Sequence, residues 1–168
     1  MTKLYLVRHG ETFDNANQLM QGQTQGELNA KGIAQTEAVA EELRDKHFDA
    51  IISSDLHRAI QTAEIIAQPH GLPVTTTPLL RERDWGDFTG RFIPDLKGLP
   101  LPENTEKLEH LLKRVSLFLD FIRTGYPKQQ VLAVGHGIVN KAVQAVLLGK
   151  DMRDIARMEN AEVRILEI

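Results

Sequence analysis

Short runs of consecutive apolar residues alternate along this chain with longer segments whose apolar residues recur every three or four positions. The clearest runs lie at 4–7, 50–52 and 131–134, and weaker ones lie at 74–77 and 163–168. Uninterrupted apolar runs of this length are typical of parallel strands that are covered on both faces. We therefore predict a strand at each of these places.

The intervening segments predict amphipathic helices at 32–46, 55–67, 105–123 and 137–148. In the first of them, one arc of a helical wheel holds Ile33, Val39, Ala40 and Leu43. Alternation of strand and helix predicts a three-layer α/β/α sandwich with a mostly parallel central sheet. No repeat, low-complexity segment or long block of like charge divides the chain, so residues 1–168 are expected to form a single domain.

Composition narrows the classes of function. The formal net charge is -3, which provides no general basic surface for nucleic acid or anionic lipid. The absence of cysteine excludes disulfides, thiolate zinc sites and thiolate nucleophiles. No apolar run approaches a membrane span, and the N-terminal run is too short for a signal peptide, so a cytoplasmic protein without a membrane or nucleic-acid partner is expected.

Polar motifs follow three of the predicted strands. Arg8, His9 and Gly10 follow the first, a segment that ends in Arg58 follows the second, and Gly135-His136-Gly137 follows the fourth. Ligands of parallel sheets bind at the carboxyl ends of the strands. Cationic side chains and free helix N-termini at that edge predict an oxyanion pocket, with the glycines allowing backbone to approach the bound group.

Taken together, four motifs resemble the histidine phosphatase superfamily, the phosphoglycerate-mutase-like proteins. They are the segments 6–12, 53–63, 80–90 and 135–137, which occur in family order and cover the chain from Leu4 to about Leu148. Each alone is a weak signal, because Arg-His-Gly could be a turn and residues 81–84 a solvated charge cluster. The resemblance implies the same fold as the alternation of strands and helices.

The resemblance also implies a mechanism. His9 is the expected nucleophile, which forms a phosphohistidine intermediate that water hydrolyses. Arg8, Arg58 and His136 are the expected phosphate ligands, because they supply fixed positive charge and donors to a group with charge spread over its oxygens. Further phosphate contacts are expected from Asn15, Gln21, Gly22 and Gly137. Neither a metal nor another cofactor is expected, and the partner is a small-molecule phosphomonoester.

Glu82 matches the position of the family's general acid and base, which protonates the leaving group and then activates water. Asp84 is the second choice. If the segment is extended, period-two geometry places Glu82 and Asp84 on one side and Arg81 and Arg83 on the other.

Hydrolysis is preferred over a mutase reaction. A mutase must shield its phosphoenzyme from water, but only residues 83–135 separate Glu82 from His136, and the chain ends after its last predicted strand. Residues 91–104, which hold three of the seven prolines, are expected either to cap the pocket or merely to connect two elements. Size and this short segment resemble the alpha-ribazole phosphatases and small broad-specificity phosphatases. Asn140 departs from the arginine expected in many relatives, which puts a substrate contact from that position in doubt.

Three alternatives stay open at this point. They are phosphoglycerate-mutase-type phosphoryl transfer, a phosphatase of phosphohistidine proteins, and a noncatalytic phosphate-binding module. A metal-dependent phosphatase is disfavoured, because the sequence contains no Asp-x-Asp motif or His/Asp metal cluster.

Overall fold

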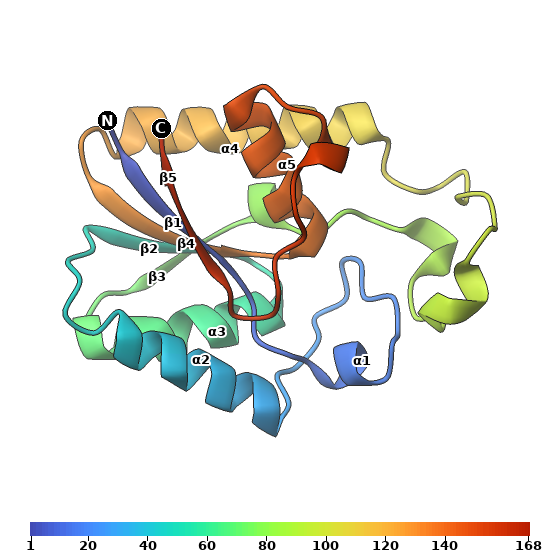
Figure 1. Cartoon of the computed structure of the whole chain (residues 1–168), viewed down its shortest axis with the longest axis horizontal. Helices are drawn as coiled ribbons and strands as arrows, with labels where there is room; N and C mark the ends of the chain where they lie inside the picture. The colour runs from blue at the N-terminus through green and yellow to red at the C-terminus, as the bar shows by residue number, and fades with distance from the viewer.

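The computed structural model describes all residues, 1–168, and is built on one five-stranded sheet (Figure 1). Its strands are β1 (Lys3–Arg8), β2 (Ala50–Ser54), β3 (Val74–Thr77), β4 (Gln130–Gly135) and β5 (Val163–Glu167), in the order β3-β2-β4-β1-β5. The pairs β1–β4, β2–β4 and β2–β3 are parallel, whereas β5 is antiparallel to β1. The predicted strands and mostly parallel sheet are confirmed.

Helices cover both faces of the sheet, as Figure 1 shows. Helices α4 (Leu108–Gly125) and α5 (Gly137–Leu148) lie on one face, and α2 (Ala30–Glu42) and α3 (His57–Ala67) lie on the other. A short helix, α1 (Phe13–Ala16), and several 3₁₀ turns complete the chain. The three-layer α/β/α sandwich is therefore confirmed.

Alternate side chains of each strand enter opposite cores. In β1, Leu4 and Leu6 pack toward α4 and α5, whereas Tyr5 and Val7 pack toward α2 and α3. All four are at most 4% exposed. Burial on both faces explains why the strands read as continuous apolar runs rather than alternating ones.

Several predicted helix boundaries are wrong. Helix α2 begins at Ala30, because the Asn29 side chain accepts a hydrogen bond from the Gly32 amide and caps the helix, and it ends at Glu42 rather than residue 46. Helices α3 and α4 begin at His57 and Leu108, two and three residues later than predicted. Ile33, expected in the buried stripe of α2, is 38% exposed.

Strand register places the expected site residues side by side. Arg8 pairs with Gly135 across β1 and β4, so His9 and His136 leave neighbouring parallel strands at the same level. The amide of His9 donates to the Gly135 carbonyl at 3.2 Å.

No helix of the chain combines the length and hydropathy that a membrane crossing needs.

Candidate active site

A cavity of about 240 Å³ lies at the carboxyl edge of the sheet. Its lining includes most of the predicted site residues, namely Arg8, His9, Asn15, Gln21, Gly22, Arg58, Glu82 and Gly137. His136 does not line the cavity, but its ring centroid lies 5.1 Å from that of His9. The structure thus brings together residues from four separate segments of the sequence.

The tautomer of His9 follows from one hydrogen bond. Its Nδ1 lies 2.7 Å from the carbonyl oxygen of Gly10. Because a carbonyl can only accept, Nδ1 carries the hydrogen of the neutral ring, and Nε2 carries the lone pair. His9 therefore presents an unprotonated nitrogen in a cavity that its ring helps to line.

Backbone carbonyls hold the two arginines in place. Arg8 Nη1 donates to the Met158 carbonyl at 2.8 Å. Arg58 Nη2 donates to the Gly22 carbonyl at 2.7 Å, and Arg58 Nη1 donates to the Thr24 carbonyl. Neither guanidinium takes part in an ion pair, so both positive charges remain available to a ligand.

Ser54, at the end of β2, orients His136. The Ser54 hydroxyl oxygen accepts from the Leu56 amide at 3.2 Å and lies 2.8 Å from His136 Nε2. The Ser54 hydroxyl donates its hydrogen to His136 Nε2, which therefore carries the lone pair. In a neutral ring the hydrogen is then on Nδ1. His136 thus becomes a neutral hydrogen-bond donor.

Three buried nitrogens around His9 have no hydrogen-bond partner: Arg8 Nε, Arg58 Nε and His136 Nδ1. Leaving a buried donor unpaired costs about 1–3 kcal/mol, so folded proteins seldom do so without a reason. Arg8 and Arg58 line the same cavity as His9, and the ring centroid of His136 lies 5.1 Å from that of His9. An oxyanion beside His9 would satisfy such donors.

Burial and the arginines keep both histidines neutral. The pKa of His9 lies well below its usual value, first because the ring is buried and then because Arg58 and Arg8 repel a further positive charge. Burial and Arg58 lower the pKa of His136 in the same way. Burial also lowers the pKa of Arg58 to about 10, which leaves it charged at neutral pH.

Gly10 and Gly135 serve packing within the protein rather than ligand approach, which corrects our expectation for these two, whereas Gly137 lines the cavity. A Cβ on Gly10 would lie 2.5 Å from the carbonyl oxygen of Gly32 in α2, and one on Gly135 would lie 2.1 Å from Asn140 Oδ1. A Cβ on Gly137 would lie 3.5 Å from the guanidinium carbon of Arg8. At Gly10 and Gly135 neighbouring protein atoms occupy the place of a Cβ, whereas the contact at Gly137 is an ordinary one, and an approach of its backbone to a ligand stays a prediction.

The carboxylate of Glu82 sits on the N-terminus of α5. Its Oε2 accepts from the Ile138 amide at 3.0 Å, and its Oε1 accepts from the amides of Val139 and Arg83, each at 2.9 Å. The N-cap residue of α5, His136, makes no side-chain cap bond, so Glu82 takes that part from outside the helix. Its position is thereby tied to the helix that follows His136.

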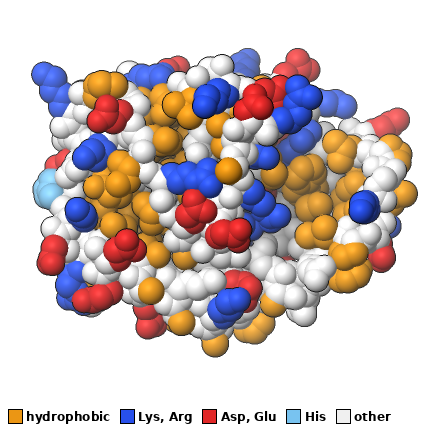
Figure 2. All heavy atoms as spheres, in the orientation of Figure 1, with side chains coloured by type: hydrophobic (Ala, Val, Ile, Leu, Met, Phe, Trp, Pro, Cys, Tyr) orange, Lys and Arg blue, Asp and Glu red, His pale blue; other side chains and the backbone are white.

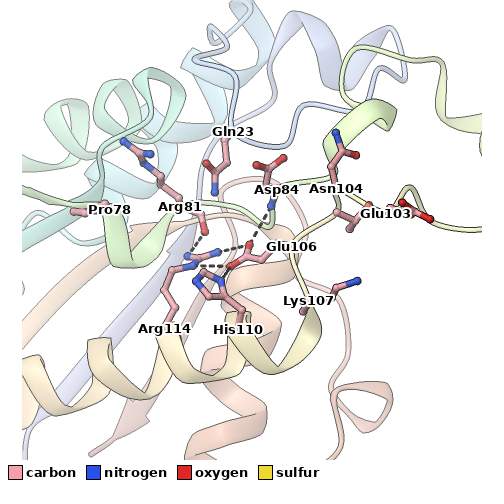
Figure 3. A pocket seen from close by; sticks show the side chains of 11 residues that line it. Gln23, Pro78, Arg81, Asp84, Glu103, Asn104, Glu106, Lys107, His110 and Arg114 are labelled. Atoms are coloured by element: carbon pink, nitrogen blue, oxygen red, sulfur yellow. Dashed lines mark hydrogen bonds and ion pairs between the residues drawn. The ribbon is translucent and has the colours of Figure 1, made fainter.

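A buried ion pair between Arg114 and Glu106 holds the backbone of residues 79–84, the segment that contains Glu82 (Figure 3). Arg114 of α4 pairs with Glu106 at 2.9 Å and donates to the carbonyls of Leu79 at 3.0 Å and Arg81 at 2.7 Å. Glu106 also accepts from the Asp84 amide at 3.1 Å and lies 2.6 Å from His110 Nδ1. We call Arg114 and Glu106 the clasp.

Asp84 faces away from His9. It lines a second cavity of about 580 Å³ together with Arg81 and the clasp, as Figure 3 shows, and its carboxylate accepts from the Gly86 amide at 2.9 Å. The expectation that Glu82 and Asp84 share one side is wrong, because the segment has no strand partner that would hold a regular pleat. Arg81 instead pairs with Asp55 at 2.7 Å.

Only part of the proline-containing segment reaches the site. Ile93 lines the cavity, whereas Glu103 and Asn104 line the second one. The Met20 amide donates to the Arg91 carbonyl at 2.9 Å and the Ile93 amide to the Gln18 carbonyl at 2.7 Å, so two loops form a common rim. Figure 2 shows hydrophobic side chains gathered at the right of the molecule, where residues 92–101 include the exposed Phe92, Leu99 and Leu101.

Among the expected phosphate contacts, two side chains also have structural bonds. Asn15 Oδ1 accepts from the Thr12 amide at 3.1 Å in the capping box of α1. Gln21 Oε1 accepts from the Thr12 hydroxyl at 2.9 Å. Asn140 is fully buried, and its amide donates to the Val7 carbonyl at 3.0 Å, so it stays out of the cavity.

Six residues of the lining were not singled out from the sequence, namely Leu19, Met20, Trp85, Ile138, Lys141 and Arg157, whereas Ile93 belongs to the segment considered as a cap. Lys141 had a usable signal, because it follows Gly137 by four residues on a predicted helix and so shares its face. No pattern marked Arg157, which lies in the loop before β5.

Comparison with known proteins agrees with this geometry. The family model of the histidine phosphatase superfamily (branch 1) matches residues 4–168. The chain therefore belongs to the histidine phosphatase superfamily, and it is an enzyme of the phosphatase type.

Individual relatives carry both phosphatase and mutase names. The chain is 38% identical over 154 residues to "Uncharacterized phosphatase PhoE" of Bacillus subtilis (strain 168), covering 90% of this chain and 80% of the relative. It is 37% identical over 164 residues to "Probable phosphoglycerate mutase GpmB" of Yersinia pestis (strain Pestoides F), covering 89% and 76%. The alpha-ribazole phosphatase of Shigella flexneri superposes with a TM-score of 0.89 at 28% identity, covering 99% and 90%.

Proposed function

We propose that this enzyme is a phosphomonoesterase that hydrolyses a small phosphorylated metabolite through a phosphohistidine on His9, without a metal. The three unpaired buried donors around the His9 ring carry the proposal. Arg8 Nε, Arg58 Nε and His136 Nδ1 match the needs of a phosphoryl group, whose charge is spread over three equatorial oxygens.

His9 Nε2 attacks phosphorus in line with the leaving oxygen. The Nδ1–H bond to the Gly10 carbonyl fixes the ring orientation and stabilises the charge that the ring gains as it attacks. Neutrality at physiological pH follows from the lowered pKa of His9. The alcohol leaves in this first step, and water displaces the phosphoryl group from His9 in the second.

Glu82 supplies the proton for the leaving alkoxide and then accepts one from water. Its Oε1 already accepts two amide hydrogen bonds, whereas Oε2 accepts only one. Because each carboxylate oxygen has two lone pairs, Oε2 is the oxygen with room for the transferred proton. This oxygen belongs to a residue that lines the same cavity as His9.

The size of the cavity supports a small substrate. About 240 Å³ is below the usual range of drug-sized pockets, roughly 300–1,000 Å³. The likeness to an alpha-ribazole phosphatase supports either an alpha-ribazole phosphate-like substrate or broad specificity.

Mutase-type phosphoryl transfer is the second candidate, because one relative bears that name. A mutase must retain its phosphoenzyme in an enclosed site. Between Glu82 and His136 the chain supplies only 3₁₀ turns, loops, α4 and β4, and of this stretch only Trp85 and Ile93 line the His9 cavity. Hydrolysis is therefore preferred.

The proposal is tested by comparing an aryl and an alkyl phosphate in excess chelator, with wild type and Glu82→Gln. Wild type is expected to hydrolyse both. Glu82→Gln should lose roughly 10²–10⁴-fold in kcat/KM on the alkyl ester and much less on the aryl ester, whose leaving group needs little protonation. We compare kcat/KM because it reports the transfer to His9, whereas the attack of water on the phosphoenzyme is common to both esters and can limit kcat for both. Loss of all wild-type activity on chelation, or an equal loss in kcat/KM on both esters, contradicts the proposal.

A further inference from the structure

The cavity around His9 contains more positive charge than one phosphate group needs. Its lining includes four basic residues, Arg8, Arg58, Lys141 and Arg157, and only one acidic residue, Glu82. This concentration occurs in a protein with a formal net charge of -3. The excess is therefore local to the cavity.

Two of the basic residues play no part in the proposed phosphate site. Lys141 lies on the face of α5 that Gly137 and Ile138 present to the cavity, one helical turn further from the phosphate-binding end. Neither Lys141 nor Arg157 is in an ion pair, and neither side chain makes a hydrogen bond within the protein. Both charges are thus available to a ligand.

The backbone around Arg157 is held firmly. Arg164 Nη2 donates to the Arg157 carbonyl at 3.2 Å, and Arg164 Nη1 donates to the Ala156 carbonyl at 2.7 Å. On the other side, Arg8 donates to the carbonyl of Met158 at 2.8 Å. Arg157 therefore extends from a fixed loop that is tied to the phosphate site itself.

The charge of Arg157 reaches the site. It lowers the pKa of Arg8, second only to burial, whereas Glu82, Glu159 and Glu162 act in the opposite direction. Glu162 is engaged by Arg164 at 2.7 Å, and neither Glu159 nor Glu162 lines the cavity. The nearby acids therefore do not occupy the cavity in place of a ligand.

Five residues of the lining are hydrophobic: Leu19, Met20, Trp85, Ile93 and Ile138. Such a wall suits the organic body of a small substrate. Figure 2 shows Lys and Arg side chains to the right of centre beside a hollow, with hydrophobic side chains on its far border.

We propose that Lys141 and Arg157 form a second anion subsite, so that the preferred substrates are compact phosphomonoesters with a second acidic group, carboxylate or phosphate, on the alcohol. This inference rests on the proposed function. The phosphoryl group contacts Arg8, Arg58 and His136, the organic body lies against the apolar wall, and the second acid pairs with the two outer cations. An interaction of this kind, present in both ground state and transition state, lowers KM more than it changes kcat.

The test uses aryl phosphates that differ only in a charged or neutral substituent. Carboxyphenyl and phosphonophenyl phosphates, each in the ortho, meta and para forms, are compared with the matching carbamoylphenyl phosphates, which have similar shape and no charge. For wild type, at least one isomer is expected to show about a tenfold higher kcat/KM for the acid than for the amide, as one charge-assisted hydrogen bond provides. In the double variant Lys141→Gln/Arg157→Gln, the ratio should fall close to 1, mainly through KM.

The control variant is Lys150→Gln, which removes an exposed charge beyond the end of α5, and it should keep the wild-type ratio. Dissociation constants of the corresponding carboxyphenyl and carbamoylphenyl phosphonates, which cannot be hydrolysed, are measured by calorimetry in parallel. An acid-to-amide ratio near 1 for every isomer, in both kinetics and binding, overturns the subsite, as does a ratio that the double variant leaves unchanged. If no phosphate is hydrolysed but the phosphonates show the ratio, the proposed function fails while the subsite stands.

Discussion

At the scale of the residue, the site depends on imidazoles that are buried and uncharged. His9 is 1% exposed and His136 is fully buried, and both lie close to two guanidinium groups. In the unfolded chain each ring has a pKa of about 6.5. Folding therefore excludes a proton that the unfolded chain binds readily in mildly acidic solution.

This difference predicts a loss of stability as the pH falls. Because the pKa of each ring is lowered in the folded state, the stabilisation is fully present above about pH 6.5 and is lost progressively below it. The free energy of unfolding, measured in urea between pH 7.5 and 5.5, should fall by up to about 1.4 kcal/mol per pH unit for each histidine.

Asparagine at position 9 removes one titrating group, so His9→Asn should reduce this slope by about half. His57→Gln, which removes an exposed histidine on α3, should leave the slope as it is. A slope that His9→Asn does not change contradicts the picture of a buried, neutral nucleophile.

At the scale of the element, the acidic segment is positioned by a helix far from it in sequence. The side chains of Arg114 and Glu106 are only 11% and 5% exposed. The clasp forms hydrogen bonds with the backbone of Leu79, Arg81 and Asp84 and lines the second cavity (Figure 3). Glu82, in the same segment, lines the His9 cavity instead. Correct placement of Glu82 thus depends on α4 as well as on α5.

Arg114→Met is expected to destabilise the protein by about 3 kcal/mol, because it leaves Glu106 and two carbonyls without their partner. The measurement is urea unfolding at pH 7.5. Arg123→Met removes an exposed pair with Asp120 on the same helix and should cost at most about 1 kcal/mol. If the two variants unfold alike, the clasp is not what holds the segment.

The sequence could predict the elements of the fold more completely than the positioning of the site. Continuous apolar runs indicated the strands, the motifs at their ends indicated His9 and Arg58, and the family resemblance implied the role of Glu82. Arg114 and Glu106 gave no signal, because charged residues on a helix are usually solvated. Arg157 gave none either, because its place beside Arg8 depends on the antiparallel return of β5, which strand patterning does not specify.

At the scale of the whole molecule, parallel pairing of β1 with β4 sets the two histidines side by side. The hydrophobic cores on the two sheet faces hold the strands in place. Helix α3 then places Arg58 at the cavity, and the N-terminus of α5 binds the carboxylate of Glu82 there. The glycines are needed for this close packing of protein against protein, most clearly where Gly32 of α2 meets Glu11. The fold thus brings residues whose buried donors have no partner close to the His9 ring.

The role of His9 as nucleophile is tested most directly by trapping the phosphoenzyme. Wild type and His9→Ala are mixed with an aryl phosphate, quenched within milliseconds under alkaline conditions that preserve phosphohistidine, and mapped by mass spectrometry. We expect an acid-labile phosphoryl group on His9 in wild type, and neither phosphoenzyme nor turnover in His9→Ala. A phosphoryl group on His136, or phosphoenzyme formation by His9→Ala, would contradict this role of His9.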